Sequence, residues 1–135
     1  MEVLITPEAG LEIEALRALR PAPSTWGAVI GHQRGPVFVV ERIFLAGSRP
    51  GVPDERALAG LDGIWPGRIL GLLAVRPDVA LRKAVLGPAW YGKLVLVLTG
   101  PVRAPVLRPF EVEFGRTFFL QPVLFAPGPK EAAHE

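Results

Sequence analysis

The alternation of apolar and polar residues predicts strands and helices along most of the chain. A short apolar run at 3–5 ends at Thr6 and Pro7, where threonine can cap a helix and proline fits the first turn. A helix is predicted over 7–19, with acidic residues early and basic residues late, as the helix dipole favours. The face that we expect to lie on a sheet holds Leu11, Ala15, Ala18 and Leu19.

Two apolar runs at 26–30 and 37–44 follow, separated by a short turn that contains Gly and Pro. This spacing predicts a β-hairpin. The density of Gly and Pro over 46–53 predicts a loop. Asp54 can then cap a second helix, which presents Ala57, Leu58 and Leu61 on one side and ends near Gly63 or Pro66.

The second half of the chain is richer in strands. Residues 68–75 are apolar on both faces, which is typical of a central strand, and 93–99 show the same pattern after a short helical or irregular piece over 79–91. Three further runs predict antiparallel strands at the sheet edge: 102–107, 110–114 and 117–125. Glu111 and Glu113 share one face there, where outward charges keep an edge strand from pairing with other chains.

These elements predict an α/β (α+β) fold, a single domain over 1–125 in which a central mixed β-sheet is flanked by two or three helices. The last residues, 126–135, predict a frayed tail. With 135 residues, half of them hydrophobic, the chain suffices for one core.

Composition excludes several kinds of chemistry. The chain has no Cys and only two His, His32 in the predicted hairpin turn and His134 in the tail, so it predicts neither a disulfide nor a cofactor or metal site. The net charge of +2 comes from scattered Arg, which argues against a nucleic-acid-binding module. No apolar run approaches the roughly 20 residues that cross a bilayer, and no signal peptide is evident, so we expect a cytoplasmic protein without membrane contact.

The order of these blocks resembles that of the JAMM (MPN-domain) metalloproteases. The similarity covers 1–115 and lies chiefly in 1–19, 26–31, 37–44, 64–71 and 94–99. It implies a JAMM/MPN-like fold. In active members a Glu precedes the first hairpin strand and a His-x-His-Pro segment ends the central strand, so that two imidazoles and a carboxylate hold Zn²⁺ and the Glu takes a proton from its water.

The resemblance places these functional positions on residues that cannot perform the chemistry. The Glu position falls on Ser24, and the His-x-His-Pro segment falls on residues 74–77, of which only Pro77 matches. Ala74 and Arg76 stand at the two His positions, and neither binds zinc. Further on, Val85 and Pro88 fall near the family's Ser and Asp positions. The resemblance therefore implies a degenerate, catalytically inactive domain.

Three functions remain open at this point. The first is a protein-interaction or scaffold module, a homodimer or the partner of an active relative, with the aromatic residues Phe118, Phe119 and Phe125 as a possible interface. The second is an enzyme or ligand-binding protein that uses the vacated pocket around Arg76 and Asp78, although the two side chains could instead pair or cap a helix. The third is a nucleic-acid-binding module.

Overall fold

A computed structural model describes residues 1–45, 52–100 and 106–126 of the chain. The elements follow the predicted order closely. They are β1 (Glu2–Ile5), α1 (Pro7–Leu19), β2 (Thr25–Arg34), β3 (Val37–Leu45), α2 (Glu55–Ile64), β4 (Ile69–Val75), α3 (Val79–Val85), the 3₁₀ helix η1 (Pro88–Trp90), β5 (Leu94–Thr99), β6 (Val106–Phe114), β7 (Phe118–Pro122) and β8 (Leu124–Phe125).

All eight strands belong to one sheet, in the order β7-β6-β5-β4-β2-β3-β1-β8. The pairs β1·β3, β1·β8 and β4·β5 are parallel, and the other pairs are antiparallel. The terminal strands β7 and β8 are separated in the chain only by Val123, whose N–H donates to the Pro109 carbonyl of β6. The sheet therefore curls until it is nearly closed like a barrel. A single α+β domain with a mixed sheet, as expected from the sequence, is confirmed.

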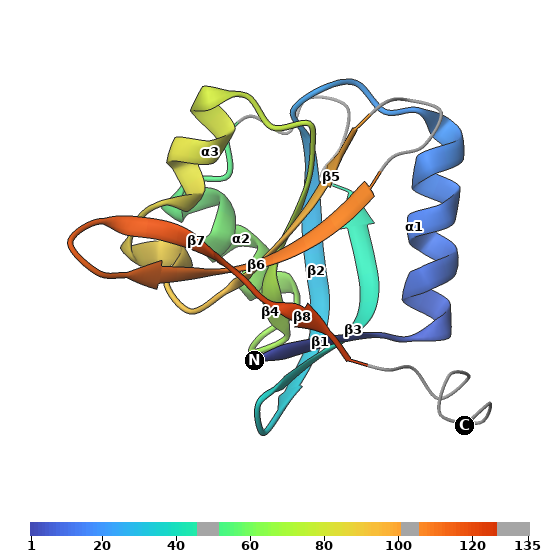
Figure 1. The fold of residues 1–135 in the computed structure, drawn as a ribbon, viewed down its shortest axis with the longest axis horizontal. Helices are drawn as coiled ribbons and strands as arrows, with labels where there is room; N and C mark the ends of the chain where they lie inside the picture. The colour runs from blue at the N-terminus through green and yellow to red at the C-terminus, as the bar shows by residue number, and fades with distance from the viewer. Residues whose placement is uncertain (46–51, 101–105, 127–135) are drawn as a thin grey trace.

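The two faces of the sheet are covered by different helices (Figure 1). One face packs against α1, and its core includes Ile13 and Leu16 of that helix. The other face lies under α2, α3 and η1, and its core includes Leu61, Leu81 and Trp90. Trp90 is 1% exposed, and its indole N–H donates to the Pro53 carbonyl at 2.8 Å, which ties η1 to the start of α2.

Helix α1 begins where the sequence predicts but buries a different face. Thr6 caps it by accepting a hydrogen bond from the Ala9 N–H at 3.2 Å. The residues that face the sheet are Ala9, Ile13 and Leu16. The expected face is wrong: Leu11, Ala15, Ala18 and Leu19 are all exposed. Both stripes are apolar, so the pattern along the chain does not decide between them; the stripe of Ala9, Ile13 and Leu16 is the one that packs into the core beside β3.

The C-terminal strands also differ from the prediction. Instead of separate strands over 102–107 and 110–114, one strand, β6, runs through Pro109, while 101–105 lie outside the described residues. Proline is tolerated there because β7 ends at Pro122, opposite Phe110, so no ladder partner faces the nitrogen of Pro109. The stretch 117–125 divides into β7 and β8.

The predicted tail is described only at its first residue. Ala126 donates its N–H to the Val3 carbonyl at 2.8 Å, and 127–135 lie outside the described residues. Within the described ranges, no helix has the length and apolar character needed to span a membrane.

Close contact between β4 and β5 predicts a sharp effect of one methyl group. A Cβ at Gly71 would overlap the Leu94 backbone carbonyl, whereas a Cβ at Gly60, on the exposed side of α2, would meet nothing within 4 Å. Gly71→Ala should lower the free energy of unfolding by roughly 2–4 kcal/mol, measured by urea denaturation. Gly60→Ala is the matched control and should raise it by about 0.5–1 kcal/mol. Equal stability of the two variants would contradict the close β4–β5 contact.

Candidate functional site

The carboxyl end of β4 brings together residues that are distant in the chain. β4 and β5 are parallel, so their carboxyl ends meet at one edge of the sheet, where α3 begins. Ser24 lies at the same place: its N–H donates to the Val75 carbonyl at 2.7 Å, and its Oγ accepts from the Asp78 N–H at 3.0 Å. The structure thus places the predicted positions Ser24 and Asp78 side by side.

The polar groups of these residues are engaged with the backbone. The Asp78 carboxylate accepts from the Leu81 N–H at 2.8 Å and caps α3, which was one of the alternatives that the sequence left open. The Arg76 guanidinium donates to the Pro21 carbonyl at 2.9 Å, and the Arg76 N–H donates to the Leu98 carbonyl. Arg76 and Ser24 have φ values of 40° and 63°. These side chains therefore hold a tight chain reversal in place at the end of β4.

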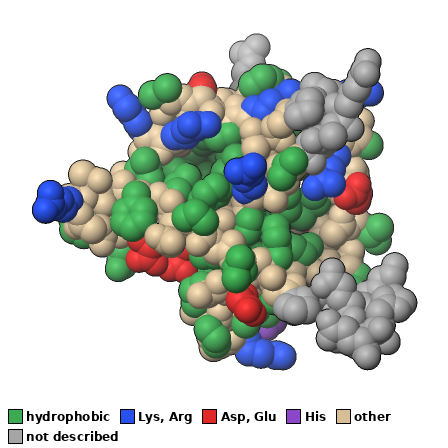
Figure 2. Space-filling model, viewed as in Figure 1, with side chains coloured by type: hydrophobic (Ala, Val, Ile, Leu, Met, Phe, Trp, Pro, Cys, Tyr) green, Lys and Arg blue, Asp and Glu red, His purple; other side chains and the backbone are tan. Residues whose placement is uncertain are grey.

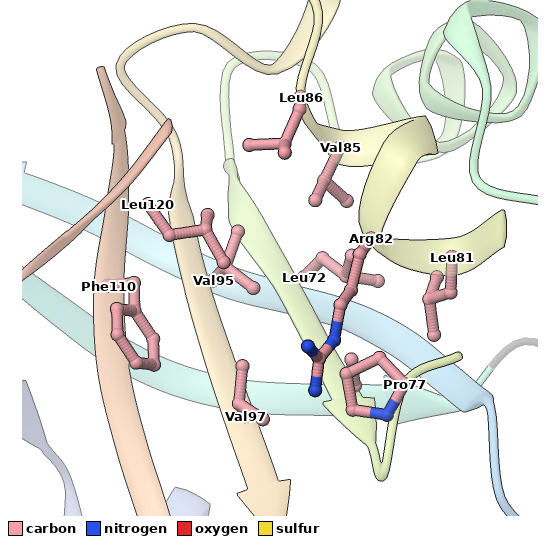
Figure 3. A pocket seen from close by; sticks show the side chains of 11 residues that line it. Leu72, Pro77, Leu81, Arg82, Val85, Leu86, Val95, Val97, Phe110 and Leu120 are labelled. Atoms are coloured by element: carbon pink, nitrogen blue, oxygen red, sulfur yellow. The ribbon is translucent and has the colours of Figure 1, made fainter. Parts of the chain in front are cut away.

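A pocket of about 230 Å³ lies next to this reversal, between α3 and the sheet (Figure 3). Its sheet side is formed by Leu72, Ala74, Val95, Val97, Phe110 and Leu120. Its other side is formed by Pro77, Leu81, Arg82, Val85 and Leu86. Of the five positions predicted from the sequence, Ala74 and Pro77 line this pocket. Ser24, Arg76 and Asp78 lie beyond its end.

The charged group at the pocket is Arg82, a residue that sequence reasoning missed. The sequence over 79–91 predicted only a helical or irregular piece, so the face on which Arg82 lies was not defined. The signal that could have found it is the spacing of Leu81 and Val85, four residues apart, which fixes the buried face of α3. Val85, at the family's Ser position, also lines the pocket, whereas Pro88 is exposed at the start of η1.

No cluster of three or more His, Cys, Asp or Glu that could hold a metal ion occurs among the described residues. The pocket instead offers apolar side chains and one guanidinium, which do not bind Zn²⁺. His32 was expected in a hairpin turn, but it lies within β2, and its Nδ1 donates to Glu41 Oε1 at 2.8 Å. His134 lies outside the described residues.

Glu41 joins β2, β3 and the start of β4. It accepts from His32 and, at 2.8 Å, from the guanidinium of Arg68, which also donates to the Gly31 carbonyl. The hydrogen bond from His32 and, after it, the charge of Arg68 hold the pKa of Glu41 below its usual 4.5. This network bridges three strands and lies away from the pocket.

Glu111 and Glu113 do not lie on an edge strand, and that prediction is wrong. β6 is paired on both sides, so Glu111 lies between Leu94 and Gln121 and is 9% exposed. Burial raises the pKa of Glu111 to about 7, helped by the hydrogen bond and negative charge of Glu113 and opposed by the Met1 ammonium. Its Oε1 is buried without a hydrogen-bond partner. The carboxyl group is therefore held in an environment that favours its protonated form.

The three Phe residues proposed as one interface lie in different places. Phe118 contacts Phe114, with ring centroids 4.8 Å apart, and Tyr91 at 6.4 Å. Phe119 lies on the opposite face of β7 and is 41% exposed. Phe125 is on β8, where it lines a groove beside α1. Only Phe118 and Phe119 are neighbours, and they lie on the two sides of one strand.

Comparison with known proteins adds information about the fold. No protein-family model and no curated protein matches the chain. Among solved structures, the solution structure of protein DSY2949 from Desulfitobacterium hafniense is similar, with a TM-score of 0.60 and 17% sequence identity, over 98% of this chain and 99% of that chain. At this identity the likeness shows a shared fold and carries no argument about activity.

The buried carboxyl group predicts a specific pH dependence. Because the pKa of Glu111 is about 7 in the folded chain against 4.5 ordinarily, the folded state retains a proton that the unfolded state loses over this range. Stability therefore falls as pH rises from 4.5 to about 7. Glu111→Gln should remove this decline. From about pH 4 to about pH 8, the unfolding free energy of the variant should therefore rise by roughly 1–3 kcal/mol relative to that of the wild type.

Urea denaturation across that pH range measures the effect. Glu113→Gln keeps Glu111 but removes its negative neighbour, so this variant should retain a shallower decline. Parallel pH profiles for wild type and Glu111→Gln would show that Glu111 has an ordinary pKa in the folded chain.

Proposed function

We propose that this chain is a catalytically inactive interaction domain with a JAMM/MPN-like organisation, and that its partner is a second copy of the chain. The observation that carries the proposal is the edge of β7, a strand without charged side chains that has no second partner among the described residues and has exposed aromatic side chains beside it. The residues at the end of β4 support the absence of hydrolysis, and the β7 edge supports the self-association.

The end of β4 lacks the groups that metal-dependent hydrolysis requires. Ala74 contributes a methyl group to the pocket, and Arg76 places a permanent positive charge near the position of a family metal ligand. Ser24 and Asp78, which could have handled a proton, are hydrogen-bonded to backbone. The resemblance places Ser24 at the position of the catalytic Glu and residues 74–77 at the metal-binding segment, which share one site in active members. Ser24 lies beside 74–78 in this chain, and this supports a JAMM/MPN-like arrangement whose chemistry has been lost.

The outer edge of β7 presents unpaired backbone groups. Val112 exchanges hydrogen bonds with residues 92 and 93, on the β5 side, so the backbone of Glu111 and Glu113 faces β7. Alternation then directs Gln121 and Phe119 toward β6 and leaves the N–H and C=O of Phe118 and Leu120 directed outward. Among the described residues β7 has no second neighbour.

The sequence of β7 has little that would prevent pairing with another strand. Natural edge strands are commonly protected by charged side chains or a central proline, but 118–122 reads Phe-Phe-Leu-Gln-Pro, with proline only at its end. An identical strand can approach this edge without repulsion between like charges. Antiparallel pairing about a two-fold axis would satisfy the outward backbone groups of both copies.

Exposed aromatic residues extend this surface. Tyr91 and Phe114 are 55% and 56% exposed and meet at Phe118, and these three residues form the aromatic patch. Figure 2 shows hydrophobic side chains gathered on the face that β6, β7 and α3 form. Aromatic side chains are enriched in protein interfaces because they bury a large area at low entropic cost.

The inactive site predicts a metal-free protein. After purification with added zinc and removal of loosely bound ions, elemental analysis should find well below one zinc per chain, and isopeptide and peptide substrates should not be hydrolysed. Stoichiometric zinc together with hydrolysis that a chelator abolishes would refute the proposal of an inactive site.

Self-association through β7 predicts a dimer that one charge disrupts. The wild-type chain should sediment as a dimer at micromolar concentrations, and Phe119→Lys should make it monomeric because two lysines would face each other across the paired strands. Leu11→Lys, a matched change at a 72% exposed residue of α1, should leave the dimer intact.

Sedimentation equilibrium separates these outcomes. A wild-type chain that stays monomeric up to about 1 mM would overturn the self-association, since its pairing would then be weaker than about 4 kcal/mol. Dimers in all three proteins would place the interface away from β7.

A further inference from the structure

The pocket beneath α3 shares only Leu120 with the β7 edge proposed for self-association. Its floor belongs to the face of the sheet that α2, α3 and η1 cover, where β4 contributes Ala74. Figure 3 shows the β-branched side chains of Val95 and Val97 from β5 on the same floor. Its wall is α3, whose Leu81 and Val85 are buried. The side chains around this space are therefore apolar, with one exception.

That exception is Arg82. Figure 3 shows its side chain reaching from α3 so that the guanidinium lies beside Pro77 and is directed toward Val97. Arg82 is exposed, and within the described part of the chain it takes part in no side-chain hydrogen bond or ion pair. Asp78, one helical turn earlier, uses its carboxylate to cap α3. The guanidinium is thus available to an anion from outside the chain.

The size of the pocket limits the ligand. An apolar cavity of about 150 Å³ holds benzene, so the 230 Å³ pocket corresponds to about nine carbon atoms. Burying such a group is favourable by about 25 cal/mol per Å² of apolar surface, and the apolar floor and wall provide the environment for it. One guanidinium at the mouth matches one carboxylate, with which it forms paired N–H···O bonds.

We propose that this pocket is a binding site for a small amphipathic monocarboxylate, a medium-chain or arylalkyl acid whose apolar part enters the pocket and whose carboxylate pairs with Arg82. Ala74 is essential to the depth of this site, because a larger side chain there would occupy the floor. The site requires no metal and no bond-breaking step, and it rests on residues that the β7 edge does not use, apart from Leu120.

The first test is a titration followed by NMR, with octanoate and 3-phenylpropionate as probes and octan-1-ol as the neutral control. Both acids should bind with a dissociation constant on the order of 0.1–1 mM and shift the methyl signals of Val97 and Leu81. Octan-1-ol should bind about tenfold more weakly, because it has no charge to pair with Arg82.

Two variants and a matched control locate the site. Arg82→Gln should weaken octanoate about tenfold and remove its advantage over octan-1-ol, whereas Lys83→Gln, at the neighbouring exposed cation, should change the affinity less than about twofold. Ala74→Val should abolish binding of both acids by filling the floor. The thermal unfolding temperature of Ala74→Val, measured alongside, shows whether this variant is folded. Arg82→Gln tests the site even if Ala74→Val does not fold.

Several results would overturn the proposal. They are equal affinity for octanoate and octan-1-ol, an equal loss in Lys83→Gln, and no binding by either acid. N-acetyl-leucyl-phenylalanine, which mimics the end of a protein chain, provides a further arm: tighter binding of this peptide than of both free acids would assign the pocket to a chain terminus instead. Each of these binding measurements can be made on the monomer or on the dimer. A failure of the proposed self-association would therefore leave this test unaffected.

Discussion

Every residue of β4 is buried, so both faces of this strand require a cover. One face is covered by α1, which follows β1 in the chain and packs over the part of the sheet in the order β2-β3-β1. The other face is covered by α2, α3 and η1. Because α3 and η1 lie in the connection from β4 to β5, the two strands run parallel and their carboxyl ends meet beneath α3. The pocket lies where this short helix crosses over strands that present the shorter side chains of Ala74, Val95 and Val97.

The same constraint explains why the polar residues near the end of β4 do not face the pocket. The chain must reverse within a few residues of a buried strand, and the backbone groups exposed by that reversal need partners. Ser24, Arg76 and Asp78 provide them, so their chemistry is used in holding the turn and starting α3. Arg82 is the polar side chain that borders the pocket without such a structural role, which is why the candidate ligand is an anion.

Local features of the structure were predictable from sequence, and relationships between elements were not. The helix caps are contacts over three residues: Thr6 and Asp54 were predicted as caps, and capping was one of the alternatives for Asp78. The buried face of α1 was not predicted, because two apolar stripes compete and the fit of Ile13 against the sheet decides between them. Glu111 was assigned to an edge because strand order is non-local. Arg82 is exposed, as expected of the scattered arginines, but its place beside the pocket was not predictable, because the roll of a seven-residue helix depends on what it packs against.

Leu120 belongs to both proposed surfaces, and this links the sheet edge to the pocket. Its side chain forms part of the pocket, whereas its backbone N–H and C=O are directed to the open edge of β7. A second strand at that edge would restrict the motion of Leu120, and a ligand beneath α3 would restrict the same residue from its side-chain end. A change at Leu120 would alter both features together and could not separate them. Phe119 and Arg82 can separate them, because the first lies on the opposite face of β7 and the second lies on α3, so each belongs to one surface alone.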